Sequence, residues 1–368
     1  MIIHFSVLGV ILFASFFWER TSKVNKIKSN DYIIAALPFV LIFGYLAFLA
    51  AMRSGLNDTS TYIETYDYFI PGTFDGIKSV ILSDGKDKGF YVLSNVIKMI
   101  FGSNYHWWFA FFAVIESLVF VYIFRRESVG ILVSCYYFFA SALYTNYFSM
   151  MRQWFAISLF LFAFKYLKNK KFWIYLIIIL VAAQFHNSAY FCIPIYFFAH
   201  LKPWSNKQLA LVVAFCIAIL FMNPVLSSLE SSDSTYSYVY ETMATSTGSS
   251  PVRIIIAAVP VVLCFIYRKK IESLHNKTLV ISINMSMLNL LLTIVATFTS
   301  GLYIIRMSTY FNIFNAILFS WLLEQVITGK NKKIIKLCFY AFYFAFYLYQ
   351  MNYQGEFYYV SDIIGNYY

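Results

Sequence analysis

The sequence predicts an all-α, polytopic integral membrane bundle, and three observations lead to that class. Of the 368 residues, 61% are hydrophobic and only 12% are charged, whereas soluble domains carry about 25% charged residues. Apolar runs long enough to cross a hydrocarbon core of ~30 Å recur along the chain. The runs lack the alternation of a barrel strand, and a helix pairs every backbone group within its own segment, as lipid requires.

We expect about 11–12 transmembrane helices in a single transmembrane domain that covers residues 1–368. Two larger loops interrupt the helices, at about 52–105 and 227–250. The first helix is expected to be retained, because no basic residue precedes its apolar core as in a signal peptide. The expected helices lie at about 2–18, 32–51, 106–124, 129–148, 152–167, 172–185, 188–201, 208–226, 251–267, 278–298, 306–326 and 334–350.

Basic residues decide the expected orientation. Of the 28 lysines and arginines, 20 fall in six connections, near 20–28, 125–126, 165–171, 202–207, 268–277 and 330–336. The positive-inside rule makes these connections cytoplasmic, which puts both termini and both long loops on the outer face. The net charge of +11 therefore reports topology, and no nucleic-acid partner is expected.

The stretch "QFHNSAY" (184–190) interrupts one of the most apolar parts of the chain. Lys171 and Lys202 flank this part on the same predicted side, so 172–201 is expected to form a hairpin that turns at "FHNS". Each arm of about 14 residues spans roughly 21 Å, which is short of the core thickness. Irregular backbone at that depth is tolerated where it lines a cavity or is buried in protein. His186 at the tip is a candidate proton-transfer group, and a histidine that caps the turn is the alternative.

Four arginines stand at the expected outer ends of helices: Arg53, Arg152, Arg253 and Arg306. Snorkelling toward the interface is one explanation for each of them. Lysine snorkels equally well, however, and arginine is preferred where a planar fork must grip phosphate or carboxylate oxygens. The set therefore favours an anion site on the outer face.

Asp58 opens the segment "DTSTYIETYDYF". If this segment is helical, Asp58, Tyr62 and Tyr66 share one face, and aromatic rings beside a carboxylate suit a sugar. Interfacial tyrosines and an N-cap aspartate are the alternatives. Glu116 is the one carboxylate deep in an expected span, where both a functional and a structural role stay open.

No metal site and no cofactor are expected. The histidines form no HxxH or HExxH pattern, and no Asp-x-Asp pair occurs on the predicted outer face. The cysteines lie in apolar runs without CxxC spacing, which favours thiols that fill the core over a disulfide framework. They are Cys135, Cys192, Cys216, Cys264 and Cys338.

Four fragments, in order, resemble the EpsG-like branch of the Wzy-type bacterial polysaccharide polymerases. They are "MRSGLNDTSTYIETYDYF", "KGFYVLSNVIK", "MRQWFAISLFLFAFKYLKNKKF" with "AAQFHNSAYFCIPIYF", and "SGLYIIRMSTYFNIF", and together they cover about residues 50–325. The first fragment departs from a tight Arg-x-Gly-x-Asp pattern because Asn57 is inserted before Asp58, which leaves the partner of Arg53 open.

The resemblance implies a glycosyltransferase at the periplasmic or outer face of the bacterial cytoplasmic (inner) membrane. It would join undecaprenyl-pyrophosphate-linked oligosaccharide repeat units into an O-antigen (lipopolysaccharide), capsule or exopolysaccharide. By the matching motifs, Arg152 and Arg306 would bind pyrophosphate, with Arg53 and Arg253 assisting. The implied partners are the lipid-linked donor and acceptor, the bilayer, a chain-length regulator and a flippase.

The resemblance also implies roles for the remaining candidates. His186 would be the base that removes the acceptor hydroxyl proton, and Asp58 an alternative base or sugar ligand. Tyr62, Tyr66 and Tyr310 would contact sugar. Because no Asp-x-Asp-like pair occurs on the predicted outer face, we expect the reaction to be independent of metal.

Three other functions compete with a polymerase. A lipid-linked oligosaccharide flippase or transporter favours buried charges through the bundle and internal repeats, which the sequence lacks. A membrane O-acyltransferase needs a histidine within reach of its acyl donor, often on the cytoplasmic side, whereas His186 is predicted outside. A polysaccharide ligase uses similar arginine and histidine chemistry and stays open.

Overall fold

The computed structural model describes residues 2–25, 32–220, 248–298, 301–353 and 358–365. Within these ranges the secondary structure is helical, and the only β pairing is an isolated antiparallel bridge between Gly55 and Val360. The all-α class is therefore confirmed. The expected loop at 227–250 falls almost entirely outside the described residues.

The chain divides into two compact units. Unit 1 comprises Met1–Ile193 and Gly329–Tyr368, and unit 2 comprises Pro194–Thr328. The expectation of one transmembrane domain stays a prediction.

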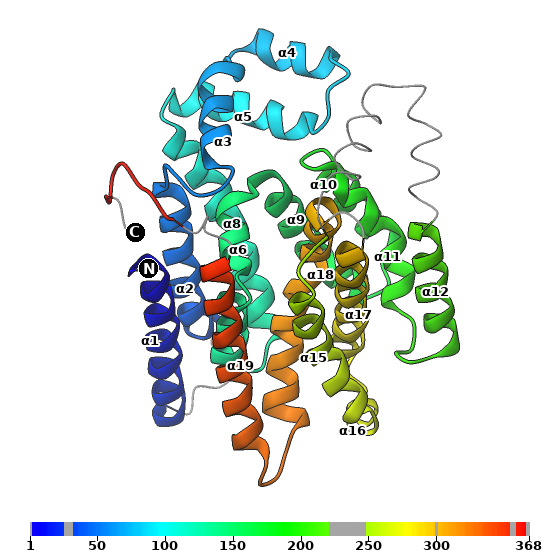
Figure 1. Cartoon of the computed structure of the whole chain (residues 1–368). Coiled ribbons are helices and arrows are strands. Elements are labelled where there is room, and N and C mark those ends of the chain that lie inside the picture. Colours follow the sequence, from blue (N-terminus) through cyan, green and yellow to red (C-terminus); the bar gives the residue numbers. More distant parts are fainter. Residues whose placement is uncertain (1, 26–31, 221–247, 299–300, 354–357, 366–368) are drawn as a thin grey trace. The chain divides into compact units, whose positions relative to one another are not determined.

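The bundle of unit 1 is built around α2, which packs along α6 (Figure 1). Helix α1 packs against α2 and α7, and α9 packs against α6 and α10. Aromatic rings fill the interior: Phe43 lies 5.3 Å from both Phe120 and Phe124, measured between ring centroids. Its helices are α1 (Ile2–Asn25), α2 (Tyr32–Met52), α6 (Tyr105–Glu127), α7 (Ile131–Ala140), α8 (Leu143–Ser149), α9 (Met151–Lys168), α10 (Phe172–Ala183) and α19 (Lys332–Tyr353).

Local sequence explains where α6 begins and ends. Asn104 is the N-cap, and its side-chain oxygen accepts a hydrogen bond from the backbone N–H of His106 at 2.9 Å. Arg125 and Arg126 lie in the last turn, where positive charge complements the helix dipole. The helix then stops before Ser128, and Gly130 precedes the next helix.

The expected helix at 129–148 is two helices, α7 and α8, and this part of the prediction is wrong. The chain breaks at Ser141 and Ala142, where Ala142 has a left-handed φ of 57°. Side chains satisfy carbonyls near the break: the Ser141 hydroxyl donates to the Tyr137 carbonyl, and the Thr145 hydroxyl donates to the Ala142 carbonyl. A second bend, of 120°, separates α8 from α9.

Helix α19 covers this break within unit 1. The Gln350 amide donates to the Ser141 carbonyl at 3.4 Å, and the hydroxyls of Tyr144 and Tyr347 lie 2.7 Å apart. Polar side chains of α19 therefore hydrogen-bond to the segment around the break, although the two segments are about 200 residues apart in the sequence.

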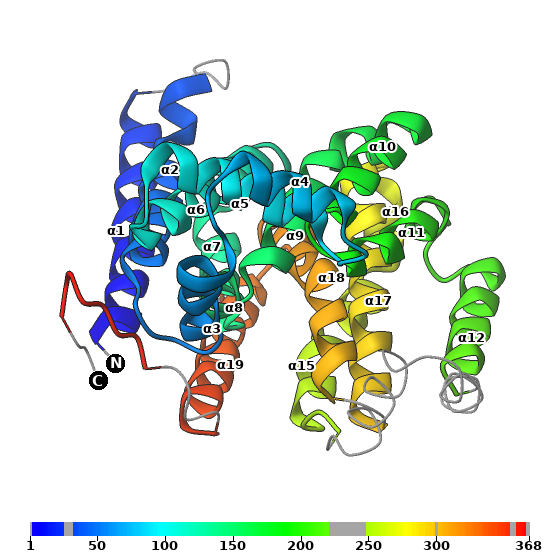
Figure 2. The same cartoon turned by 90° about the horizontal axis from the view of Figure 1, so that it is seen from above.

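The expected loop at 52–105 is largely helical. It contains α3 (Thr59–Glu64), which continues into a π-helical turn (Thr65–Phe69), then α4 (Phe74–Leu82) and α5 (Lys88–Phe101). Helices α4 and α5 lie side by side in both views (Figures 1 and 2). On α5, the buried residues Phe90, Ser94 and Ile97 follow a helical period, and they pack in one cluster with residues of α6 and α9. We call residues 59–101 the helical cap.

Three described helices are long and apolar enough to cross a membrane: Tyr105–Glu127, Lys277–Phe298 and Lys332–Asn352. A fourth span is possible if Leu143–Ser149 and Met151–Lys168 cross together as one bent pair. Shorter apolar helices of 10–17 residues accompany them, which makes this a multi-pass membrane protein. Among the described residues, fewer full-length spans are found than the expected 11–12, and one expected helix, at 129–148, is broken into α7 and α8.

At each end of unit 1, a contact joins segments that the charge pattern places on the same side of the membrane. At one end, Lys168 at the end of α9 contacts both carboxylate oxygens of Glu127 at the end of α6, at 2.5 and 2.7 Å. At the other end, a ring nitrogen of His106 lies 2.8 Å from the carbonyl oxygen of Ala51. Both contacts pair helix ends that the charge pattern puts on the same side, while the side of the membrane that each end faces stays a prediction.

Unit 2 is a separate group of helices in which α17 packs along α18. Its polar centre is Asn284, whose amide donates to the carbonyls of Phe198, Ala199 and Leu201 and whose oxygen accepts from Gln208 at 2.6 Å. Its elements are α11 (Cys192–Ala199), which begins at the boundary, α12 (Asn206–Leu220), α15 (Val252–Ile266), α16 (Arg268–Ser273), α17 (Lys277–Phe298), α18 (Gly301–Trp321) and a π-helical turn (Leu322–Val326).

Residues 358–365, here called the C-terminal strap, lie across the end of α2 in unit 1. The Val360 carbonyl accepts from the backbone N–H groups of Ser54 and Gly55 at 2.8 and 3.1 Å. Asp362 contacts His106 at 3.0 Å and accepts from the Tyr105 hydroxyl at 2.9 Å. Partial burial opposes ionisation of Asp362, but these bonds outweigh it and lower the pKa of the carboxyl.

We expect Asp362→Asn to loosen the strap and lower the temperature of thermal unfolding. The carboxylate is half exposed, so the loss should be small, about 0.2–1 kcal/mol. Because the folded pKa lies below the unfolded value of about 3.9, this stabilisation is complete above the unfolded pKa and is lost as the pH falls through the folded pKa. Unfolding of the detergent-solubilised protein at pH 7 and in acid measures it. Asp84→Asn, at an exposed loop carboxylate, is the control, and equal midpoints for both variants at pH 7 would contradict the prediction.

Candidate functional site

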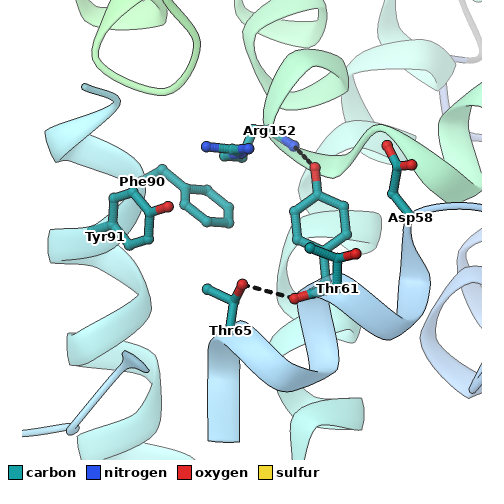
Figure 3. A pocket seen from close by; sticks show the side chains of 7 residues that line it. Asp58, Thr61, Thr65, Phe90, Tyr91 and Arg152 are labelled. Atoms are coloured by element: carbon teal, nitrogen blue, oxygen red, sulfur yellow. Dashed lines mark hydrogen bonds between the residues drawn. The ribbon is translucent and has the colours of Figure 1, made fainter. Parts of the chain in front are cut away.

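A cavity of about 140 Å³ lies in unit 1 where the helical cap meets α9 (Figure 3). Three segments contribute to its walls: the start of the cap, the first turn of α5, and the first turn of α9. Both polar and aromatic side chains line it. The lining residues are Asp58, Thr61, Tyr62, Thr65, Phe90, Tyr91 and Arg152.

Arg152 is the cation of the cavity. It stands in the first turn of α9, just after the 120° bend, and its side chain is 36% exposed. Its Nη1 lies 3.0 Å from Oδ2 of Asp87, and its backbone N–H donates to the hydroxyl of Tyr62 at 3.5 Å. The guanidinium carbon lies 5.8 Å from the ring centre of Phe90, above which Figure 3 shows it. The bend therefore places the Arg152 guanidinium at the cavity, and one side of this guanidinium is bound by the Asp87 carboxylate.

Asp87 is the residue that the sequence analysis missed. It precedes α5 with a left-handed φ of 56° and is buried. Its second oxygen, Oδ1, accepts from the backbone N–H of Asn187 at 3.1 Å. Burial raises the pKa of this carboxyl, while Arg152 and the Asn187 amide act in the opposite direction. Its position directly before the amphipathic fragment "KGFYVLSNVIK" was the one feature of the sequence that could have drawn attention to it. Nothing in the neighbouring sequence identifies its two partners.

The start of α5 is pressed against the turn at 184–187. The backbone N–H of Phe90 donates to the Gln184 carbonyl at 3.2 Å. A Cβ added to Gly89 would lie 2.7 Å from Cβ of Gln184 and 3.1 Å from its carbonyl oxygen. Only glycine permits this approach of two backbones, so the position of Asp87 relative to the turn is set by packing on both sides.

The predicted turn around His186 is present. Helix α10 ends at Ala183, and the Tyr175 hydroxyl donates to the Cys192 carbonyl at 2.5 Å, which shows that the chain folds back. The expected continuous helix at 188–201 is wrong, because a 3₁₀ turn (Asn187–Phe191) precedes α11. Local side-chain bonding explains the tight turn, since His186 caps it.

His186 itself takes the capping arrangement that was the alternative to catalysis. Its Nδ1 accepts from the backbone N–H of Ser188 at 3.3 Å and lies 2.6 Å from the Ser188 hydroxyl. A neutral imidazole whose Nδ1 accepts must carry its proton on Nε2. The ring does not line the cavity, but its neighbour Asn187 is bonded to Asp87.

The expected sugar-binding face divides in two. Asp58 occupies the N-cap position of α3 without a side-chain capping bond and lines the cavity, as does Tyr62. Tyr66 lies in the π-helical turn, where it is fully buried: its ring stacks on Trp108 at 4.7 Å and its hydroxyl donates to the Gly102 carbonyl. This burial raises the pKa of Tyr66 to about 12. Tyr66 therefore supports the wall behind the cavity and is not part of its lining.

Arg53 is also buried away from the cavity. Its guanidinium lies 4.0 Å from the ring centre of Phe109, and it donates to the Ala50 carbonyl and the Thr59 hydroxyl. Burial lowers the pKa of Arg53 to about 10, which leaves it charged at neutral pH, and the buried Glu116 is one of the groups that act against this shift. These contacts join the end of α2 to the start of the helical cap, next to Asp58.

Arg253, Arg306 and Tyr310 lie in unit 2. Arg253 is in the first turn of α15 and is half-buried. Arg306 is half-buried on α18, and Tyr310, one turn later, is buried. Their roles in pyrophosphate and sugar binding stay predictions.

Within the described ranges, no group of three or more histidine, cysteine or acidic side chains is arranged to hold a metal ion. Cys135, Cys192 and Cys264 are buried, as expected of thiols in the core. Cys338 on α19 is exposed, which corrects that expectation for this residue. The side chain of Cys216 lies outside the described part of the structure.

Comparison with known proteins identifies the family. The model of the EpsG family matches residues 36–361. This range contains every residue of the cavity, the Asp87 contacts and the turn at His186. No curated protein and no solved structure matches the chain significantly. The family model covers most of the chain and confirms the resemblance drawn from its fragments: the protein belongs to the EpsG family.

Proposed function

We propose that this protein is a bacterial polysaccharide polymerase, a membrane glycosyltransferase that joins undecaprenyl-pyrophosphate-linked oligosaccharide repeat units. The EpsG family is consistent with a membrane protein of polysaccharide synthesis. The single observation that carries the proposal is the cavity that combines Arg152, Asp58 and aromatic rings beside a membrane-spanning bundle. We place the reaction at the outer face of the cytoplasmic membrane, because the charge pattern puts the helical cap there.

The size of the cavity limits what it would bind. Its 140 Å³ is below the roughly 300–1,000 Å³ of a complete small-molecule site. It therefore suits one group of a substrate, such as a phosphate or part of a sugar, while the rest of a lipid-linked oligosaccharide would extend beyond it.

Arg152 suits a pyrophosphate leaving group. As the bond between the donor sugar and the phosphate breaks, negative charge develops on phosphate oxygens, and a preorganised guanidinium stabilises that charge. Guanidinium has five N–H donors, so the bond from Nη1 to Asp87 leaves donors for an anion in the cavity.

Two groups are candidates for the base that takes the acceptor hydroxyl proton. Asp58 lines the cavity and would touch the sugar directly. His186 has one basic ring atom, Nδ1, which is engaged by Ser188, so a proton would reach it through the Ser188 hydroxyl or after that contact opens. The catalytic roles of His186 and Asp58, and sugar contact by Tyr62, are proposals on this geometry.

The remaining roles follow from the resemblance. We propose that Arg306 and Arg253 contribute to pyrophosphate binding and that Tyr310 contributes to sugar binding. Arg53 and Tyr66 would act indirectly, because both are buried behind the cavity. A chain-length regulator and a flippase are proposed partners.

The glycan of a strain that lacks the protein tests the function. A polymerase deletion should leave single repeat units attached to their final acceptor, because transfer of one unit does not need polymerisation. A ligase deletion should leave no attached glycan at all. Analysis of the lipid-linked and the attached glycans by mass spectrometry separates the two outcomes, and long chains in the deletion strain would contradict both functions.

Arg152→Lys should keep the charge and lose the planar fork. We expect chain elongation to slow by about 10²-fold, the usual effect of removing one donor to a developing oxyanion, with normal amounts of protein in the membrane. The rate is measured as the glycan length distribution in the complemented deletion strain, with Arg306→Lys tested in parallel. Arg126→Lys, at an exposed arginine in the last turn of α6, is the matched control. Wild-type chain lengths in Arg152→Lys would rule out phosphate binding by this residue.

His186→Ala should reduce elongation by about 10²-fold or more if the imidazole is the general base. The elongation rate should be measured at several pH values, because loss of the base removes its ionisation from the pH profile. His275→Ala, at an exposed histidine in the connection before α17, is the control. Near-normal chain lengths at every pH would exclude His186 as the base and leave Asp58.

A further inference from the structure

Asp87 contacts two parts of the candidate site, but it is not among the residues that line the cavity. Its Oδ2 lies 3.0 Å from Nη1 of Arg152, and its Oδ1 accepts from the backbone N–H of Asn187 at 3.1 Å. One carboxylate therefore bridges the arginine on α9 and the turn that carries His186. The side chain is only 9% exposed, and both of its oxygens are used.

We propose that Asp87 is a positioning residue that sets the guanidinium of Arg152 and the turn at His186 in a fixed arrangement before substrate binds. This inference rests on the proposed function. Asp87 would neither accept the proton nor bind the sugar; it would act through the two groups that it holds.

The backbone around Asp87 fits such a role. Its left-handed φ of 56° is a conformation that aspartate tolerates better than most residues. The next two residues press against the turn, through the close approach of Gly89 to Gln184 and the hydrogen bond from Phe90 to the Gln184 carbonyl. These contacts hold the backbone from which the Asp87 carboxylate extends against the turn.

Stability alone is a poor explanation for the pair. A buried ion pair often contributes no more to stability than a well-packed apolar pair of similar volume, because desolvation offsets the attraction. A carboxylate on one side has a different effect on an arginine that binds phosphate. It orients the guanidinium, so the arginine loses less side-chain entropy when the anion binds. The cost is a competing negative charge beside the anion.

These opposing effects give a kinetic signature. Asp87→Asn removes the competing charge and keeps an oxygen for the Asn187 amide. The KM for the lipid-linked oligosaccharide should therefore stay the same or fall, while kcat falls by about 10²-fold, the effect expected when a reacting geometry is misplaced by about 1 Å. A residue that only stabilised the fold would lower the amount of folded protein and leave kcat per folded molecule unchanged.

The experiment uses the full chain, purified and reconstituted in vesicles, with Asp84→Asn as the control for an exposed aspartate of the same loop. Asp87→Asn should have little further effect in an Arg152→Lys background, because the carboxylate acts through that arginine. A raised KM with unchanged kcat, fully additive effects with Arg152→Lys, or kinetics equal to those of Asp84→Asn would each overturn the proposal. If Asp87→Asn does not fold, the same comparison is made with Asp87→Glu, which keeps the charge but displaces it.

A measurement without turnover separates this inference from the proposed function. Hydrogen–deuterium exchange of the peptide that covers 184–191 should be faster in Asp87→Ala than in Asp84→Asn, because the Asn187 amide loses its acceptor. Unchanged exchange would show that Asp87 does not hold the turn. If the wild-type protein shows this protection but extends no glycan, the proposed function fails while the link between Asp87 and the turn stands.

Discussion

One carboxylate, that of Asp87, holds the candidate site together. A buried charge is costly unless it is paired and hydrogen-bonded, and Asp87 meets this requirement with a guanidinium on one side and a backbone amide on the other. Because the two partners come from α9 and from the turn after α10, satisfying the charge also brings these segments to the start of α5. The cavity lies beside this junction and takes its cation from it.

The same requirement recurs at other points of unit 1. Arg53 buries its charge against the ring of Phe109 and the first residues of the helical cap, and Glu127 pairs with Lys168 at the opposite end of the bundle. The contact of Arg53 with Phe109 joins the end of α2 to α6, and the Glu127–Lys168 pair joins the ends of α6 and α9. A buried charge is costly when it is left unpaired, so these contacts favour helix arrangements that bring the charged partners together.

The sequence was informative where a pattern is repeated or summed over many residues. Apolar runs and the distribution of basic residues predict a helical membrane protein, the turn at His186, and the grouping of helix ends within unit 1. Spacing placed Asp58 and Tyr62 on one face, and both line the cavity. The same spacing was misleading for Tyr66, because the π-helical turn alters the helical register and the Tyr66 ring stacks on Trp108. The partners of Asp87 could not be predicted from the sequence, because periodicity indicates which face of a helix is buried but not which distant group contacts that face.

The break between α7 and α8 has a consequence for how the protein is made. Two short helices joined by a left-handed alanine expose carbonyl groups that lipid cannot satisfy. One of these carbonyls, at Ser141, is bonded to Gln350, and Tyr144 meets Tyr347 on the same late helix. Unit 1 therefore cannot reach its final packing while only its first half has left the ribosome. The contacts between the early segment and α19 form only after α19 is synthesised, about 200 residues later.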